Sequence, residues 1–190
     1  MEGRGSEVIE ASGAGRRIRI QPHGSTRQRR RRLQARVALL SLVLAPIAMA
    51  THEVLHLMVY YAFGYRAVMQ VTPWKLQAAG LQILGLHVAA LGDPPAAVHV
   101  ADNFLGPALA ALLLLVLWRA ARPSALAEAL LANLLIQSFF SSIETAFAVL
   151  ERIAHLDADV LLLPELNYGV CIAIITAIAL LAPRRRWGPA

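Results

Sequence analysis

Residues 37–63, VALLSLVLAPIAMATHEVLHLMVYYAF, form the stretch of sequence that decides the fold. This run is apolar for longer than the ~20 residues that a helix needs to cross about 30 Å of hydrocarbon. An arginine cluster within residues 27–36 directly precedes it. The triplet Ala48-Met49-Ala50 resembles a signal-peptide cleavage site, but the apolar run continues well beyond it. We therefore expect a retained first transmembrane helix.

Three further apolar runs follow, over residues 96–118, 124–150 and 166–181. The chain is 57% hydrophobic, above the usual share of a soluble domain. The sequence thus predicts an all-α membrane protein with about four transmembrane helices. With four spans, the N-terminal arginine cluster, Arg119 with Arg122, and the arginines at 184–186 fall on one side, which places both termini in the cytoplasm by the positive-inside rule. We expect a multi-pass protein of a prokaryotic plasma membrane.

The connection between the first two spans, residues 64–95, has a pattern of its own. Val68, Gln70 and Thr72 begin an alternation, which Pro73 interrupts before a second apolar stretch containing glycines. Alternation followed by turn residues is typical of strands. Non-helical backbone at membrane depth requires shielding by protein. We predict a short β-hairpin or a re-entrant segment here.

The tails differ from this apolar middle part, residues 37–183. Residues 1–36 carry ten arginines against three glutamates, and residues 184–190 form a basic C-terminal tail. The first tail is predicted to be disordered and cytoplasmic. Beside long apolar runs, such charge indicates membrane topology and contact with lipid, and it excludes nucleic acid as the expected partner. The single cysteine, Cys171, excludes an intramolecular disulfide and a cysteine-based metal site.

The first span contains His52-Glu53-Val54-Leu55-His56, which matches the pattern H-E-x-x-H. Histidines at i and i+4 share one helical face, so both can bind one metal ion, and the glutamate can deprotonate a water molecule there. A charged group at mid-bilayer costs about 2.5–3.5 kcal/mol on insertion scales, which makes it a functional candidate. We therefore predict a Zn²⁺ site with Glu53 as the general base. The alternative is a set of polar groups that only hydrogen-bond the helices together.

This helix, a later Gly-Pro element and a downstream aspartate together resemble the site-2 protease family of intramembrane zinc metalloproteases. The resemblance covers about residues 37–182 and departs from the family pattern in two places. The Asn that commonly follows Gly-Pro is missing, and no Gly follows Asp157 or Asp159. The resemblance implies zinc ligands His52, His56 and Asp157, and a substrate path past Asn103, Gly106 and Pro107. Asp159 and His155 remain alternatives to Asp157 or supports for the ligands.

The third span carries a polar stripe, Asn133, Gln137, Ser141 and Glu144, with spacings that place all four on one face. Lipid would penalise this face, so it is expected to point inward. Asn133 and Gln137 are candidates for the substrate path, and Glu144 is a further alternative ligand or a support for one. Interhelical hydrogen bonding is the competing interpretation.

The leading hypothesis is an intramembrane zinc endopeptidase that cleaves membrane-spanning or membrane-proximal segments of a transmembrane protein. The alternative is a non-proteolytic membrane scaffold, with a structural metal or none, that binds lipid or another protein. A metal transporter is disfavoured because the spans contain neither an internal repeat nor a chain of ligands.

Overall fold

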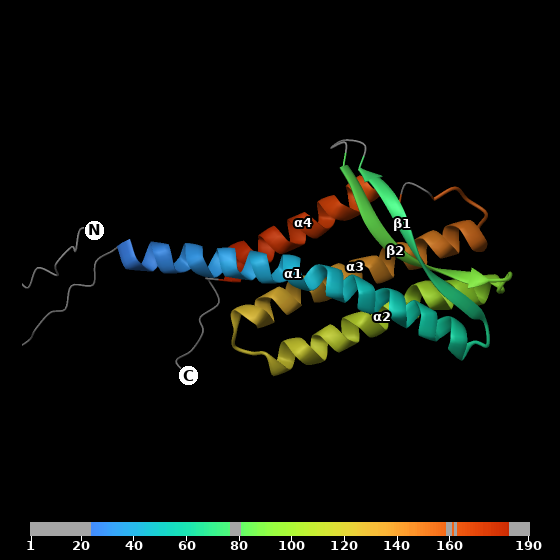
Figure 1. Ribbon diagram of the computed structural model, residues 1–190, viewed down its shortest axis with the longest axis horizontal. Coiled ribbons are helices and arrows are strands. Elements are labelled where there is room, and N and C mark those ends of the chain that lie inside the picture. Colours follow the sequence, from blue (N-terminus) through green and yellow to red (C-terminus); the bar gives the residue numbers. More distant parts are fainter. Residues whose placement is uncertain (1–23, 77–80, 159–160, 162, 183–190) are drawn as a thin grey trace, which may run out of the picture.

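The computed structural model describes residues 24–76, 81–158, 161 and 163–182. Most of this chain is helical, and the helices lie side by side with a two-stranded hairpin across one end (Figure 1). The elements are α1 (Gly24–Ala62), β1 (Arg66–Leu76), β2 (Leu81–Leu91), α2 (Ala96–Ala120), α3 (Ala125–Arg152) and α4 (Pro164–Leu181). The predicted helical fold with a hairpin after the first helix is confirmed.

The start of α1, the connection between α2 and α3, and the end of α4 all lie at one end of the bundle (Figure 1). The hairpin and the connection between α3 and α4 lie at the other end. Among the described residues, the arginines at 27–36, Arg119 and Arg122 thus lie toward the first end, whereas Arg66 and Arg152 lie toward the other.

Within the described part of the chain, three helical segments are long and apolar enough to cross a membrane: Arg27–Ala62, Ala96–Ala120 and Ala125–Arg152. The fourth predicted span differs, because α4 has 18 residues and so a length of about 27 Å. This helix is apolar but slightly shorter than the hydrocarbon thickness of about 30 Å.

Helix α1 also begins earlier than expected, at Gly24, so the arginine-rich segment before residue 37 is helical rather than disordered. Arginine, glutamine, leucine and alanine favour helix, and a segment that extends an existing helix needs no new nucleus. The rest of the predicted N-terminal tail and the tail at residues 184–190 lie outside the described residues.

In contrast to water-soluble proteins, the bundle exposes many large apolar side chains and buries several polar ones. The outer faces of α1 and α2 expose large apolar side chains, including Leu39, Leu42, Val43, Ile47, Leu112, Leu113 and Val116. Beside an apolar core, the interior buries His52, Glu53, His56, Asp102, Asn133 and Gln137. Such a distribution is typical of a helical bundle that is surrounded by lipid.

Close contact between α1 and α3 depends on small residues. Ala132 is fully buried on α3 in an apolar cluster that includes Val37 of α1, and Asn133 donates from Nδ2 to the carbonyl oxygen of Ser41 on α1 at 3.3 Å. Small side chains let helix backbones approach, and the interhelical hydrogen bond fixes their relative position. This contact fixes how the polar stripe of α3 faces α1.

The hairpin pairs β1 with β2 in antiparallel register, with Gln70 opposite His87. Gly64 and Gly92 flank the two strands with φ values of 82° and 107°, which glycine adopts without strain. Pro73 lies opposite Leu84 inside the ladder. Proline is tolerated there because each strand of a two-stranded sheet has a free edge. Of the two alternatives for residues 64–95, the described residues therefore form the hairpin.

Candidate metal centre

His52 and His56 lie one turn apart on α1 and are both buried, with 1% and 6% of their surface exposed. Their Nε2 atoms are 2.9 Å apart. We call these two residues the His pair. The prediction that histidines four residues apart share one helical face is confirmed, since both imidazoles present a nitrogen to the same point.

Glu144 on α3 completes a group of three residues that could hold a metal ion. Its Oε1 lies 3.3 Å from Nε2 of His52, and its Oε2 lies 3.2 Å from Nε2 of His56. Ligands that bind Zn²⁺ tetrahedrally at about 2.0–2.1 Å are separated from one another by about 3.3 Å. The donor set and its dimensions therefore fit zinc, with two imidazoles and one carboxylate as in many catalytic sites.

Gln137, about two turns before Glu144 on α3, determines which nitrogen of His52 carries the proton. Its Oε1 lies 2.7 Å from Nδ1 of His52, while its Nε2 lies 3.6 Å from Sδ of Met49. With the amide oxygen facing His52, Nδ1 is the donor and the neutral ring keeps a lone pair on Nε2. That lone pair faces both the carboxylate of Glu144 and Nε2 of His56, so a proton or a metal cation must lie among these three groups.

Asp102 on α2 occupies the corresponding position behind His56. Its Oδ2 is 3.0 Å from Nδ1 of His56, although the ring N–H is not aligned for a hydrogen bond. Carboxylates and carbonyls behind metal-binding histidines orient the rings and increase their basicity. Asp102 was not among the residues predicted from the sequence; its signal was an acidic side chain within a predicted membrane span.

Three buried or nearly buried carboxylates, from Glu53, Asp102 and Glu144, surround the His pair. Among the residues whose side chains the structure describes, every lysine or arginine is exposed. Negative charges in a low-dielectric interior require compensation by a cation or by protons. A divalent ion at the His pair would offset most of this charge.

A cavity of about 520 Å³ borders the His pair. Glu53 lines it, with Oε1 3.9 Å from Nε2 of His52. Farther along the wall, Tyr60 Oη lies 2.9 Å from Nδ1 of His99. Residues from all four helices and from β2 contribute to the cavity, so there is space beside the candidate ligands for a bound molecule.

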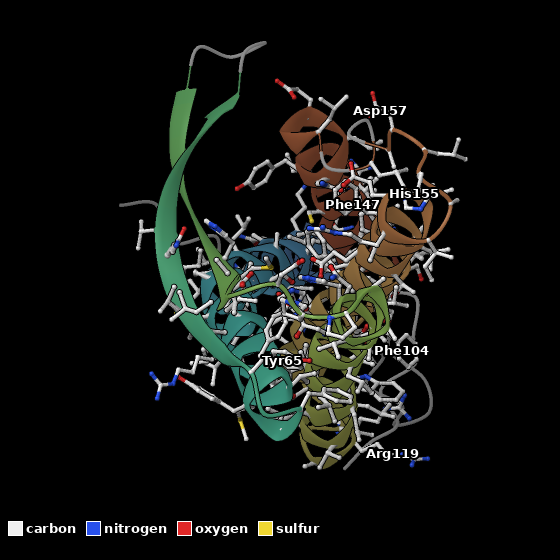
Figure 2. All side chains as sticks on the ribbon, turned by 90° about the vertical axis from the view of Figure 1, so that its right-hand side faces the viewer. Tyr65, Phe104, Arg119, Phe147, His155 and Asp157 are labelled. Atoms are coloured by element: carbon white, nitrogen blue, oxygen red, sulfur yellow. The ribbon has the colours of Figure 1, made fainter. Side chains whose placement is uncertain are left out.

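The expected third ligand, Asp157, is not part of the group around the His pair. Asp157 and His155 are exposed on the connection after α3, at the edge of the molecule in Figure 2. The backbone leaves α3 there, after Arg152, and carries both residues away from α1. Asp159 lies outside the described residues. The described structure thus favours Glu144, the alternative on the polar stripe, over Asp157.

The prediction that the polar stripe of α3 faces inward is confirmed, and its members have different contacts. Asn133 and Gln137 are each 1% exposed, and Ser141 contacts the carbonyl oxygen of Phe104 at 3.3 Å. Asn133 bonds to α1, and Gln137 contacts His52, so neither is free for a substrate. Asn103 on α2 does line the cavity, and it also donates to the carbonyl oxygen of its own helix at His99.

Gly106 and Pro107 are both buried on α2, where the helix passes the ring of His56. A Cβ added to Gly106 would lie 2.7 Å from Nδ1 and 2.8 Å from Cε1 of that ring. Real Cβ atoms essentially never approach so closely, so His56 keeps this position only if residue 106 has no side chain. The Gly-Pro element therefore shapes the metal centre as well as the packing of α2.

We expect Gly106→Ala to displace His56 and to lower zinc affinity at least about tenfold, the lower range seen when ligand support is lost. Overpacking should also destabilise the fold by about 1–3 kcal/mol. Zinc retention during dialysis against a chelator and the Tm measure the two effects. Gly169→Ala is the matched control, because nothing lies within 4 Å of a Cβ there. Equal zinc retention in the two variants would contradict the close contact.

Comparison with family models, with curated proteins and with solved structures finds no match for this chain.

Proposed function

We propose that this chain is an intramembrane zinc endopeptidase. One observation carries the proposal: the His pair and Glu144 converge at metal-ligand distances, with Glu53 beside them on the wall of a large cavity. Two imidazoles and a carboxylate around a cavity leave a coordination position open, which is characteristic of catalytic rather than structural zinc sites.

The membrane setting is supported by the three long apolar helices and by their exposed apolar faces. Lipid would contact these faces, and the arginine-rich end of the bundle would lie at the cytoplasmic surface by the positive-inside rule. The metal centre would then be reached from within the bundle rather than from lipid, because the His pair is buried.

His52, His56 and Glu144 would hold the metal, and Gln137 and Asp102 would orient the two rings. Zinc bound there supplies Lewis acidity toward a carbonyl oxygen and makes water a nucleophile near neutral pH. Glu53 accepts the proton from the attacking water at its carboxylate and delivers it to the leaving amine. The cavity in which this transfer would occur is lined by residues of all four helices and of β2.

The wall formed by β2 supports a peptide as the substrate. Five consecutive residues, 86–90, border the cavity, whereas no described residue of β1 does. Successive side chains of a strand point to opposite faces, so such a continuous run means that the backbone edge itself faces the cavity. An unpaired strand edge accepts an extended peptide through main-chain hydrogen bonds. A transmembrane segment would have to unwind locally to bind there.

The proposed function places the chain beside the site-2 proteases, on the strength of H-E-x-x-H in a membrane-spanning helix and a Gly-Pro element on a later one. The proposed third ligand differs from the downstream aspartate of that family. Glu144 lies on α3, before the connection that carries Asp157. The proposed relationship is therefore one of shared chemistry with a different ligand set.

A metal-free membrane scaffold is the second candidate, and a specific arrangement favours it. Protons on both imidazoles would also satisfy Glu144, through two buried ion pairs at 3.2 and 3.3 Å. Together with the interhelical contacts of Asn133 and Ser141, such pairs would only join the helices. In that case the cavity would have no catalytic role.

Zinc analysis and a cleavage assay separate the two candidates. Detergent-purified protein without a polyhistidine tag is expected to contain about one zinc ion per chain and to cleave unfolded casein. His52→Ala should lose both properties, and chelation followed by zinc addition should abolish and restore cleavage by the wild type. Zinc-free wild-type protein, purified without chelators, would leave the scaffold as the better description. Bound zinc without cleavage would indicate a structural metal.

A further inference from the structure

Asn167, near the start of α4, is a buried polar residue that the metal centre does not use. Its surface is 4% exposed, and its Nδ2 donates to the carbonyl oxygen of Leu161 at 3.4 Å. Its Oδ1 is buried and has no hydrogen-bond partner within the described part of the chain. An acceptor left in this state costs about as much as a lost hydrogen bond, so it calls for a reason.

The position of Asn167 provides that reason. It is the one described residue of α4 that borders the cavity beside the His pair. Helix α4 also contacts the hairpin, whose strand β2 forms another wall of the same cavity. A polar group on one wall and a strand edge on another flank the space in which a peptide would lie.

We propose that Asn167 is a substrate-binding residue that accepts a backbone N–H of the bound peptide through Oδ1. A carbonyl oxygen is an acceptor, so it selects a hydrogen-bond donor rather than an anion. Peptide N–H groups are such donors, and one of them remains free on the side of an extended peptide that does not pair with β2. The same side chain keeps its amide donor on Leu161, which holds the carbonyl in place.

This inference rests on the proposed zinc peptidase function, and two hydroxamate probes separate the two ideas. Acetohydroxamate binds a zinc ion but has no peptide body, whereas N-acetyl-trileucine hydroxamate has backbone N–H groups as well. Dissociation constants for both are measured by titration calorimetry on the zinc-loaded, detergent-solubilised full chain. The wild type is expected to bind both probes and to bind the peptide probe more tightly.

Asn167→Leu is expected to lower the affinity for the peptide probe about tenfold, which corresponds to the loss of one hydrogen bond. Its affinity for acetohydroxamate should be unchanged. Asn167→Asp keeps an acceptor oxygen but lacks the amide donor, so it should retain most of the affinity for the peptide probe. Thr176→Val is the control, because it removes an exposed polar group elsewhere on α4.

Equal affinity of wild type and Asn167→Leu for the peptide probe would overturn the proposal. An equally large loss of peptide-probe affinity in Asn167→Asp would also overturn it, and so would a loss of acetohydroxamate affinity in Asn167→Leu. Both patterns indicate a structural role for Asn167. A zinc-loaded wild type that binds neither probe would refute the open metal centre, and this inference with it. A wild type that binds both probes with equal affinity would overturn the inference alone.

Discussion

Glu144→Ala is expected to abolish stoichiometric zinc binding, whereas Asp157→Ala retains it. Glu144 provides both of its carboxylate oxygens at 3.2–3.3 Å from the His pair, while Asp157 lies exposed beyond the end of α3. Substitution of a residue that only hydrogen-bonds to a metal ligand typically lowers metal affinity about 10–100-fold. Removal of one of three ligands should therefore lower it more than about 100-fold. Zinc content after dialysis against a competing chelator measures the difference.

Glu144→Gln is the companion variant, because it keeps the volume of the side chain and removes only its charge. This variant should fold as the wild type does. Its affinity for zinc should nevertheless be much lower than that of the wild type. Loss of zinc from Asp157→Ala, with retention in both Glu144 variants, would reverse the assignment. The connection after α3 would then have to reach the His pair in the zinc-bound protein.

Glu53→Gln is expected to lower casein cleavage about 10²–10⁴-fold while zinc stays bound, since general acid–base groups contribute rate enhancements of that size. Glu53 lines the cavity and lies 3.9 Å from Nε2 of His52 through Oε1, farther than Glu144. Its carboxylate is therefore placed to move a proton rather than to hold the metal. Cleavage rates at equal zinc content, for wild type and variant, give the ratio.

The control for this comparison is His52→Ala, which should lose zinc and activity together. Undiminished cleavage by Glu53→Gln would remove Glu53 from the mechanism and would point to another base. If Glu53→Gln also lost zinc, Glu53 would belong to the metal ligands instead. Each result thus assigns Glu53 to one role.

The glutamate of the H-E-x-x-H pattern and the carboxylates of Glu144 and Asp102 make the centre strongly acidic for a buried site. This excess of acid must be compensated either by protons or by a metal ion, whichever of the two functions holds. It also gives the two candidate functions different expectations for a purified sample, since only one of them requires a divalent ion.

Several features of the fold could be predicted from the sequence because they depend only on residues that are close together in the chain. The apolar runs predicted the helices, the alternation after residue 64 predicted the hairpin, and H-E-x-x-H predicted two histidines on one face. The spacing of Asn133, Gln137, Ser141 and Glu144 predicted an inward face on α3. Each of these predictions uses a periodicity within one helix or strand. Such a periodicity can be recognised without knowing which other elements pack against it.

Which residues meet the His pair was decided only by the tertiary structure. Gln137 and Glu144 come from α3, and Asp102 and Gly106 from α2, so their positions depend on how those helices rotate and slide against α1. Small residues and the hydrogen bond from Asn133 to Ser41 set that arrangement, and sequence spacing carries no information on it. The sequence therefore determined that α1 could present a metal-binding pair, and packing determined that Glu144, rather than Asp157, lies opposite it.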